Sequence, residues 1–290
     1  MYYVQTQRRN FNRSTEDVGN IVEFGHVNTR VPDQRLATLF YVTGLGLTRD
    51  PYLVTGVDNM WINAGTTQFH LPTGAAQVLR GVTVLAVPDL DALAARLSRV
   101  AGALADTRFS VTPGDGHIEV SCPWGNRLRC ELSDGTRLGI KAVELATAPG
   151  TAAGIARFYR EIFDTPAAAG ETFAIVPAGL HTALVYRETD AAPPDYDGAH
   201  VQIALADFSG PHGRLLLRGL ITEESSQHQY RCQDIVDLDT GAVLCTIEHE
   251  VRSMRHPMFA RPLVNRDPSI SNNVFAPGRE ALVLGIDPTS

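Results

Sequence analysis

The spacing of apolar residues predicts two amphipathic helices at corresponding places along the chain. Leu36, Leu39 and Phe40 recur three and four positions apart, which is the spacing of a helix that buries one face. Asp33 precedes this run and is suited to cap the first turn of the helix. The same pattern returns over residues 155–162, behind a Pro-Gly-Thr turn. Each helix is predicted to follow a short strand.

Strand-like segments follow each helix. In the first half of the chain we expect strands near residues 59–71, 80–87 and 117–132, with one more helix over residues 90–97 before the last of them. The order is therefore strand, helix and three strands, and it occurs twice. This order predicts an α+β protein made of two tandem βαβββ modules.

A weak internal repeat supports the duplication. His26 lies as far before Phe40 as Glu144 lies before Phe158. Unrelated domains would not be expected to keep such landmarks in step. Three further pairs hold nearly the same spacing: Ala64-Gly65 with Ala178-Gly179, Val82–Asp89 with His200–Asp207, and Gly125 with Gly241.

The repeat divides the chain into four segments. We expect an N-terminal arm over residues 1–19, a first module over 20–137, a second module over 138–256 and a C-terminal extension over 257–290. The extension is rich in Pro, Asn, Arg and Gly and is predicted to be an irregular, packed segment. Wrapping around the body and a subunit contact are the alternatives for it.

Composition excludes several classes of protein. Hydrophobic residues make up 44% of the chain and charged residues 20%, so a normal core can form. The net charge of −7 and the absence of a basic run argue against binding to nucleic acid. No apolar run is long enough to span a membrane, and the first residues lack the apolar core of a secretory signal. The four cysteines form no CxxC pair, so we expect reduced thiols in a cytoplasmic protein.

The doubled βαβββ pattern carries two local motifs. The first is His-Val-x-x-x-Val-Pro-Asp at residues 26–33, and the second is Pro-Trp-Gly-Asn at residues 123–126, before a last strand. Together they resemble the vicinal oxygen chelate superfamily, which includes glyoxalase I, bleomycin-resistance proteins and type I extradiol dioxygenases. The resemblance implies that each module forms a curved mixed sheet with flanking helices. It also implies a divalent metal in the cup of the sheet, chelated by two neighbouring oxygens of a small substrate.

Six of the nine histidines lie in the second module, which favours a site there, because imidazole is a common metal ligand. His200 matches a metal histidine of the dioxygenases, whereas the first module has Val82 at that place. Glu144 occupies the first-strand position at which the family usually has a metal histidine. The resemblance therefore implies His200 and Glu144 as metal ligands.

The ligand from the last strand is ambiguous. The family's glutamate position, four residues beyond the turn glycine, is occupied by Cys245. Glu248 and Glu250 share a face opposite Cys245 and His249, so Glu248 fits only if a bulge or a longer hairpin shifts the register. We take Glu248 as the third ligand. The alternative is that these acids form a charged strand end that pairs with Arg252.

Three residues are candidates for catalysis by the same resemblance. His228 lies near the place of a histidine that handles protons in the dioxygenases, and the pKa of imidazole suits that task. His181 matches a second active-site histidine, one that lies near the bound oxygen. The ring-cleavage tyrosine of the family has no exact counterpart, since Ile235 falls near its place. Tyr230 shares a strand face with His228 and is the substitute we expect.

The leading hypothesis is a metal-dependent, extradiol-dioxygenase-like oxygenase acting on a small substrate with vicinal oxygens. Iron(II) is the expected metal, with manganese, zinc and nickel as alternatives. We expect no partner other than the small-molecule substrate and a second copy of the chain in a homodimer, and no contact with nucleic acid or membrane.

Two rival functions stay open. The first is a glyoxalase-type lyase or isomerase, with a metal between the modules held by His26, Glu131, Glu144 and a residue of the strand 245–250. A site within the first module alone is poorer, because Arg129 and Val82 occupy two of its ligand positions. This resembles dioxygenases in which the first module has only a structural role. The second rival is a metal-free binding or resistance protein. His70 is expected to be structural.

Overall fold

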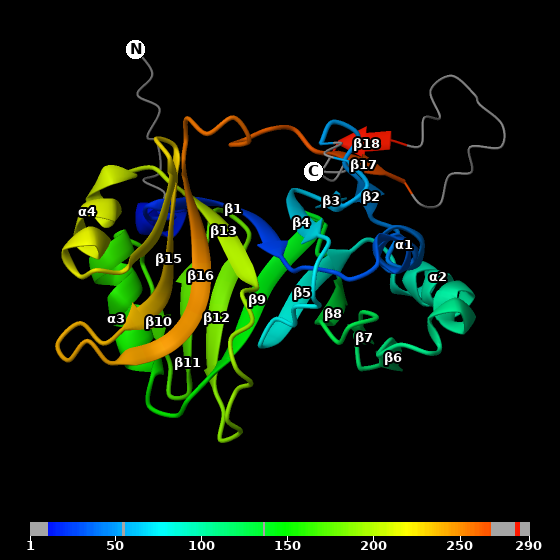
Figure 1. Cartoon of the computed structure of the whole chain (residues 1–290), viewed down its shortest axis with the longest axis horizontal. Helices are drawn as coiled ribbons and strands as arrows, with labels where there is room; N and C mark the ends of the chain where they lie inside the picture. Colours follow the sequence, from blue (N-terminus) through cyan, green and yellow to red (C-terminus); the bar gives the residue numbers. More distant parts are fainter. Residues whose placement is uncertain (1–10, 54–55, 136, 268–281, 285–290) are drawn as a thin grey trace, which may run out of the picture.

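The computed structural model describes residues 11–53, 56–135, 137–267 and 282–284, and within them the chain forms four consecutive βαβββ units (Figure 1). The predicted α+β class is confirmed. Each predicted module contains two of these units, because the strands after the first helix are shorter and more numerous than the hydrophobic pattern indicates. The segment 59–71, for instance, is a hairpin rather than one strand.

The units follow one another along the chain. The first consists of β1 (Ile21–Asn28), α1 (Gln34–Ala37) continuing into the π-helix η2 (Thr38–Gly44), β2 (Thr48–Arg49), β3 (Asn59–Ala64) and β4 (Thr67–Pro72). The second consists of β5 (Gly81–Val87), α2 (Leu90–Ala101), η3 (Gly102–Leu104), β6 (Ser110–Pro113), β7 (His117–Ser121) and β8 (Arg127–Leu132). The third consists of β9 (Gly139–Thr147), α3 (Ala152–Phe163), β10 (Ala168–Ala169), β11 (Phe173–Pro177) and β12 (Ala183–Glu188). The fourth consists of β13 (His200–Leu205), α4 (Ser209–Leu217), β14 (Ile221–Ser226), β15 (Gln229–Val236) and β16 (Val243–Ser253).

The three helices predicted from apolar spacing are confirmed as α1, α2 and α3. Asp33 caps α1, and its Oδ1 accepts hydrogen bonds from the backbone N–H of Arg35 and Leu36 at 2.7 and 2.9 Å. The apolar stripes of the helices pack on the sheets, and α3 contributes Ile155, Phe158 and other fully buried residues to the core. None of the described helices is long and apolar enough to cross a membrane.

The units are shared between two eight-stranded sheets. The first sheet has the order β14-β15-β16-β13-β1-β4-β3-β2 and joins the first unit to the last. The second sheet has the order β10-β11-β12-β9-β5-β8-β7-β6 and joins the two middle units. Each sheet therefore takes four strands from each predicted module, whereas the resemblance implied one sheet per module. The opening strands of the units pair antiparallel, β1 with β13 and β9 with β5, and this pairing removes edges that would otherwise be open.

The described part of the C-terminal extension packs on the body. Its strand β17 (Val264–Arg266) pairs with β18 (Leu282–Leu284). The side-chain amide of Asn265 accepts from the N–H of Gly65 at 3.0 Å and donates to the C=O of Gly65 at 2.9 Å. Residues 268–281 and 285–290 of the extension, and residues 1–10 of the N-terminal arm, lie outside the described residues.

The two sheets meet at Gly65, which forms an isolated bridge with Gly139. Gly65 has φ +60°, and a Cβ there would lie 1.9 Å from the C=O oxygen of Leu138. This position therefore requires glycine for both its backbone conformation and its close approach.

We expect Gly65→Ala to destabilise the protein by about 3 kcal/mol or more, because the backbone must separate at the junction of the sheets. The matched control is Gly116→Ala, which has φ +69° but open space around its Cβ and should lose only about 1 kcal/mol. Urea unfolding measures both. Equal losses in the two variants would contradict the crowding argument.

Candidate metal centre

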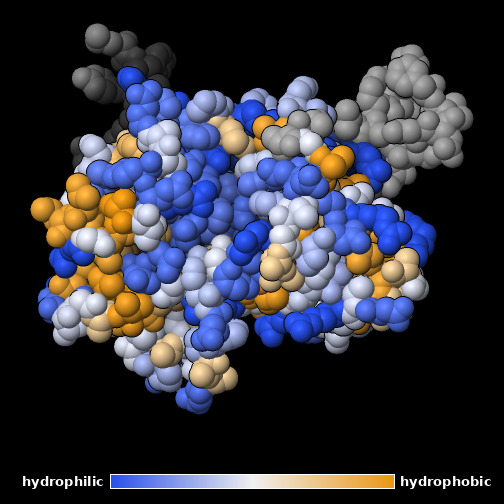
Figure 2. All heavy atoms as spheres, viewed as in Figure 1, coloured by the Kyte–Doolittle hydropathy of each residue, from blue (hydrophilic) through white to orange (hydrophobic). Residues whose placement is uncertain are grey.

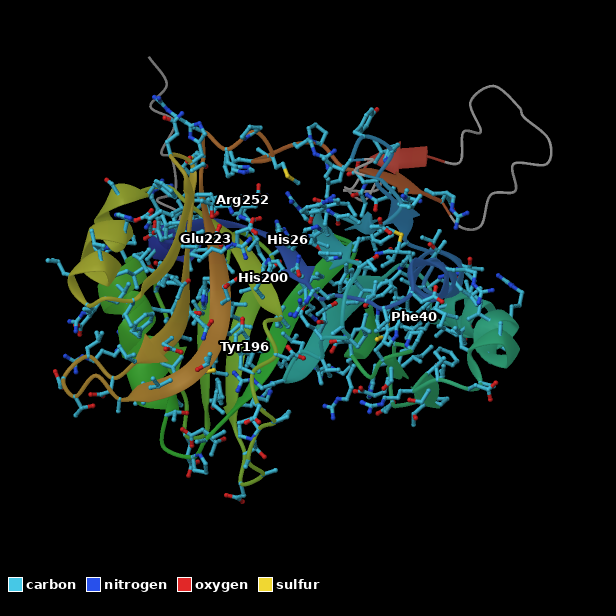
Figure 3. The ribbon with its side chains drawn as sticks, viewed as in Figure 1. His26, Phe40, Tyr196, His200, Glu223 and Arg252 are labelled. Atoms are coloured by element: carbon cyan, nitrogen blue, oxygen red, sulfur yellow. The ribbon has the colours of Figure 1, made fainter. Side chains whose placement is uncertain are left out.

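Three buried polar side chains meet on neighbouring strands of the first sheet. His26 comes from β1, His200 from β13 and Glu250 from β16, and these strands are neighbours in the order β16-β13-β1. Figure 3 labels the two histidines near the middle of the molecule. One ligand atom from each residue lies within 4.8 Å of the others. The residues are 1%, 7% and 4% exposed, respectively. Two imidazoles and one carboxylate thus form a compact group, which we call the His-His-Glu cluster.

The cluster has ligand atoms with no hydrogen-bond partner. The Nε2 atoms of His26 and His200 are buried and make no hydrogen bond within the described part of the chain, although His200 Nε2 lies 3.5 Å from Glu250 Oε2. Burial of an unpaired polar atom costs free energy, so such atoms are rare in folded proteins. Two imidazoles and a carboxylate suit a divalent transition metal and leave coordination positions open. The donor set of the His-His-Glu cluster therefore fits a metal ion.

Two arginines hold the carboxylate of Glu250. Arg231 Nη2 lies 2.8 Å from its Oε2, and Arg252 Nη2 lies 2.5 Å from its Oε1. Burial alone would raise the pKa of Glu250, but His200, whose Nε2 lies 3.5 Å from Glu250 Oε2, and the positive charge of Arg252 lower this pKa overall. Glu250 is therefore ionised, and its two oxygens lie beside arginines.

A second carboxylate orients His200. The Nδ1 atom of His200 lies 3.4 Å from Glu248 Oε1, on the opposite side of the ring from the unpaired Nε2. Glu248 is itself fixed by an ion pair with Arg231, and its backbone N–H donates to the hydroxyl of Tyr196 at 3.2 Å. A carboxylate behind a histidine sets the tautomer and ring direction of a metal ligand. Glu248 therefore suits a supporting role beside the cluster.

Aromatic rings enclose the cluster on the side of β4. The ring of His26 meets Trp61 edge-on at 5.0 Å between centroids, and Trp61 stacks on His70 at 3.9 Å. Burial, together with the positive charge of Arg252 and the neighbouring imidazoles, lowers the pKa of His26 well below its usual value. The imidazole is therefore neutral, as metal binding requires.

His70 is the fourth imidazole near the cluster, and amide side chains occupy both of its nitrogens. Asn28 Nδ2 lies 2.5 Å from its Nδ1, and Asn59 Oδ1 lies 2.7 Å from its Nε2. Burial, followed by the charge of His200, lowers the pKa of His70 to about 3. These contacts suit the structural role expected of His70.

Glu144, a ligand predicted from the resemblance, is not part of this cluster. It lies on β9 in the second sheet, where Arg129 and Arg187 bind its carboxylate at 2.8 and 3.0 Å. Val82 lies opposite Glu144 on β5. The three strands β9-β5-β8 of the second sheet thus carry a closed ion pair where β1-β13-β16 of the first sheet carry the His-His-Glu cluster. Glu144 is separated from His200 because β9 and β13 join different sheets.

None of the three residues predicted to be catalytic belongs to the His-His-Glu cluster. His181 is exposed in the turn between β11 and β12 and lines a separate cavity. His228 lies half-buried in the turn between β14 and β15. Tyr230 is buried on the other face of its strand, against Phe208 and His212, and its hydroxyl donates to the C=O of Phe208 at 3.4 Å. Burial raises the pKa of Tyr230, which keeps the phenol protonated.

The structure selects Glu250 over Glu248 as the carboxylate of the cluster. The strands β15 and β16 slip in register, because Cys232 pairs with His249 whereas Asp234 pairs with Thr246. The prediction of Glu248 as a metal ligand required a register shift of this kind. In the structure, however, Glu248 lies beside Nδ1 of His200 and outside the cluster. His26, considered in sequence only for a site between the modules, completes the group. The His-Val-x-x-x-Val-Pro-Asp motif was the signal for it.

A buried hydrogen-bonded chain lies behind the cluster, on the other face of β16. The hydroxyl of Tyr159 on α3 is 2.5 Å from His249 Nε2 and 2.5 Å from the hydroxyl of Tyr186 on β12. His249 Nδ1 lies 2.9 Å from the C=O of Ile247. This chain ties the first sheet to the second through α3, and it fixes the strand segment that carries Glu250.

Polar side chains also gather over the cluster on the outside of the molecule. Figure 2 shows a hydrophilic surface over the middle of the face at which β13 and β16 lie, whereas apolar side chains gather near α3 and α4.

Comparisons with known proteins give the fold. No family model and no curated protein matches the sequence. A candidate dioxygenase from Bacillus subtilis subsp. subtilis str. 168 has a TM-score of 0.54 at 15% identity, over 82% of this chain and 86% of its own. Glyoxalase I from Zea mays has a TM-score of 0.54 at 13% identity, over 82% and 94% of the two chains. A mutant form of that enzyme gives 0.56 at 14% identity, over 80% and 92%. The chain has the fold of the vicinal oxygen chelate superfamily, as its sequence predicts.

We expect the stability of the protein to fall as the pH is lowered from 6.5 towards 4, in part because of His249. Burial lowers the pKa of His249 from 6.5 to about 4, so the unfolded chain takes up its proton first on acidification. The contribution of this group is about 3 kcal/mol across that window. His249→Phe should flatten the pH dependence of the free energy of unfolding, whereas Tyr159→Phe should keep it. An unchanged pH slope in His249→Phe would contradict the assignment.

Proposed function

We propose that this protein is a metal-dependent enzyme that binds a divalent ion at His26, His200 and Glu250 and acts on a small substrate with two neighbouring oxygens. Iron(II) is the metal we favour, and an oxygenase of the extradiol-dioxygenase type is the leading activity. The observation that carries the proposal is the His-His-Glu cluster, with two buried imidazole nitrogens that lack a partner. Two histidines and one carboxylate are the usual ligands of non-haem iron(II) oxygenases.

The residues of the chain have separate tasks in this proposal. His26 and His200 supply nitrogen ligands, and Glu250 supplies the negative charge. Glu248 fixes the tautomer of His200, and Arg231 holds both glutamates in place. When bound, the ion would supply a Lewis acid with open positions for the two substrate oxygens.

A glyoxalase-type lyase or isomerase is the second candidate. Two observations favour it. The cluster takes His26 from the first predicted module and the other two residues from the second, and a site shared by the modules is what that rival requires. The fold is also similar to that of glyoxalase I from Zea mays. Glu131 and Glu144, which that rival included, are bound to Arg129 in the second sheet and take no part.

We expect purified protein to bind about one metal ion per chain and the ligand variants to lose it by tenfold or more. The variants are His26→Ala, His200→Ala and Glu250→Gln, each loaded with iron(II), manganese(II), zinc(II) or nickel(II) and desalted. Elemental analysis gives the metal content per chain, and circular dichroism checks that each variant is folded.

Glu144→Gln is the matched control. Like Glu250, Glu144 is a largely buried carboxylate on a strand and is bound by two arginines. This variant should keep its metal. Loss of metal in Glu144→Gln with retention in Glu250→Gln would return the site to the assignment made from sequence. Wild-type protein free of every metal would leave the metal-free binding protein as the surviving reading.

The two enzymatic candidates differ in their need for oxygen. With the metal-loaded protein and a panel of catechols and hemithioacetals, an oxygenase consumes dissolved O₂ with substrate and stops under strict anaerobiosis. We expect turnover of a catechol that follows this pattern. Turnover of a hemithioacetal that continues without O₂ would overturn the oxygenase and establish the glyoxalase-type activity.

A further inference from the structure

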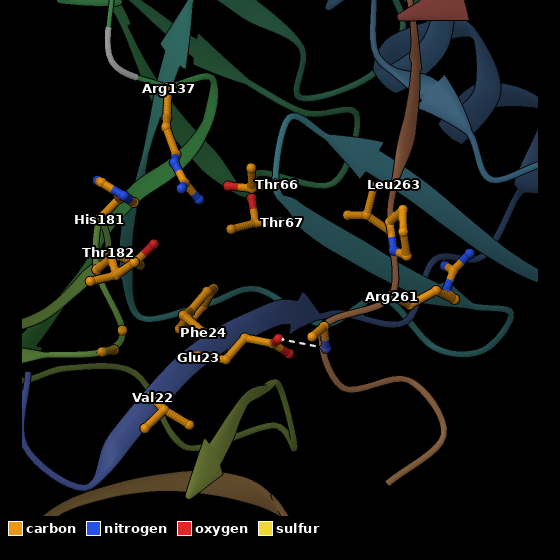
Figure 4. A pocket seen from close by; sticks show the side chains of 15 residues that line it. Val22, Glu23, Phe24, Thr66, Thr67, Arg137, His181, Thr182, Arg261 and Leu263 are labelled. Atoms are coloured by element: carbon orange, nitrogen blue, oxygen red, sulfur yellow. Dashed lines mark hydrogen bonds between the residues drawn. The ribbon is translucent and has the colours of Figure 1, made fainter. Parts of the chain in front are cut away.

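A cavity of about 420 Å³ lies away from the His-His-Glu cluster, between the start of β1, the turns β3–β4 and β11–β12, and the C-terminal extension (Figure 4). None of the three cluster residues lines it. Its volume lies in the range of about 300–1,000 Å³ that is usual for pockets that bind small molecules. No role proposed above uses this cavity.

The extension forms the roof of the cavity and is held at several points. The backbone N–H of Ala260 donates to Glu23 Oε2 at 3.0 Å. Arg261 pairs with the buried Asp50 at 2.5 Å, and Asn265 is bonded to Gly65. The roof is therefore fixed to the first sheet on both sides of Pro262, and the cavity is formed before any ligand arrives. Preformed cavities bind with a smaller loss of conformational entropy.

The polar groups of the cavity lie at opposite ends. Arg137 and His181 approach from one side, and Glu23 lies on the other, near Phe24 (Figure 4). The guanidinium of Arg137 has no ion-pair or hydrogen-bond partner among the described residues, although the backbone C=O of Arg137 accepts from Ser133. The carboxylate of Glu23, by contrast, accepts a hydrogen bond from the backbone N–H of Ala260 in the extension. Arg137 is thus the cationic group of the cavity that is available to a ligand.

Apolar side chains fill the walls between these ends. Phe24, Val22 and Leu263 line the interior, and Leu180, which is 67% exposed, lies at the rim. A ligand with an apolar body gains by covering this surface. A ligand with a second negative charge at its far end would place that charge near the carboxylate of Glu23, which disfavours dicarboxylates that span the cavity.

We propose that this cavity binds a small organic monocarboxylate with an apolar body. The carboxylate pairs with the guanidinium of Arg137, whose two parallel N–H groups match its two oxygens, and the imidazole of His181 lies beside the pair. The apolar body contacts Phe24 and Leu263. Burial and the charge of Arg137 lower the pKa of His181, so this imidazole is available as a neutral hydrogen-bonding group.

The test uses phenylacetate and its neutral analogue phenylacetamide, which have nearly the same shape. By isothermal titration calorimetry, wild-type protein should bind phenylacetate at least about tenfold more tightly, as a charge-assisted forked hydrogen bond requires. Arg137→Met should abolish the preference for phenylacetate and leave weak binding of both phenylacetate and phenylacetamide. Arg127→Met is the matched control, since Arg127 is exposed on β8 and outside the cavity, and it should behave as the wild type.

The proposal does not depend on the metal centre, and one further variant keeps the two apart. His200→Ala should bind phenylacetate with unchanged affinity. Loss of binding in His200→Ala would place the carboxylate at the cluster and overturn the assignment to the cavity. Equal affinity for the two probes, an affinity unaffected by Arg137→Met, or no binding of either probe at millimolar concentration would also overturn it.

Discussion

The antiparallel pairing of β1 with β13 is the constraint on which the rest of the structure depends. These strands belong to the first and last of the four units, and their hydrogen bonds join the two ends of the fold into one sheet. The pairing brings Asn28 opposite His200 and His26 opposite Gln202. Because β16 then pairs parallel with β13, Glu250 reaches the same place from the other side. The His-His-Glu cluster is thus a consequence of strand order.

Corresponding strand positions of the two sheets carry different polar groups. In the second sheet, Glu144 and Arg129 neutralise each other across Val82, so a buried charge is satisfied within the protein. In the first sheet, arginines balance the charge of Glu250, yet the Nε2 atoms of His26 and His200 make no hydrogen bond within the described residues. Removal of one partner from a buried charged group typically costs about 3–5 kcal/mol. The retention of such a group with unpaired nitrogens favours a functional role over a structural one.

Support for the cluster comes from layers that lie behind it. Glu248 and Arg231 hold the outer nitrogen of His200 and the carboxylate of Glu250. The chain of Tyr159, Tyr186 and His249 joins β16 to α3 and to the second sheet. The extension adds a further tie, because Asn265 closes on Gly65 where the two sheets meet. A site built on the centre of a sheet and held from both faces keeps its geometry better than one on loops.

The sequence by itself determined the class of fold, the helices and several members of the site. Apolar spacing and Asp33 located α1, and the repeat indicated a duplicated chain, since these signals are local or depend only on order. His26 and His200 were visible for the same reason. Which strands became neighbours was decided only by the tertiary structure, because strand pairing joins residues far apart in the chain and leaves no local signature. That pairing put Glu144 into the other sheet and brought Glu250, rather than Glu248, within reach of the ligand atoms of both histidines.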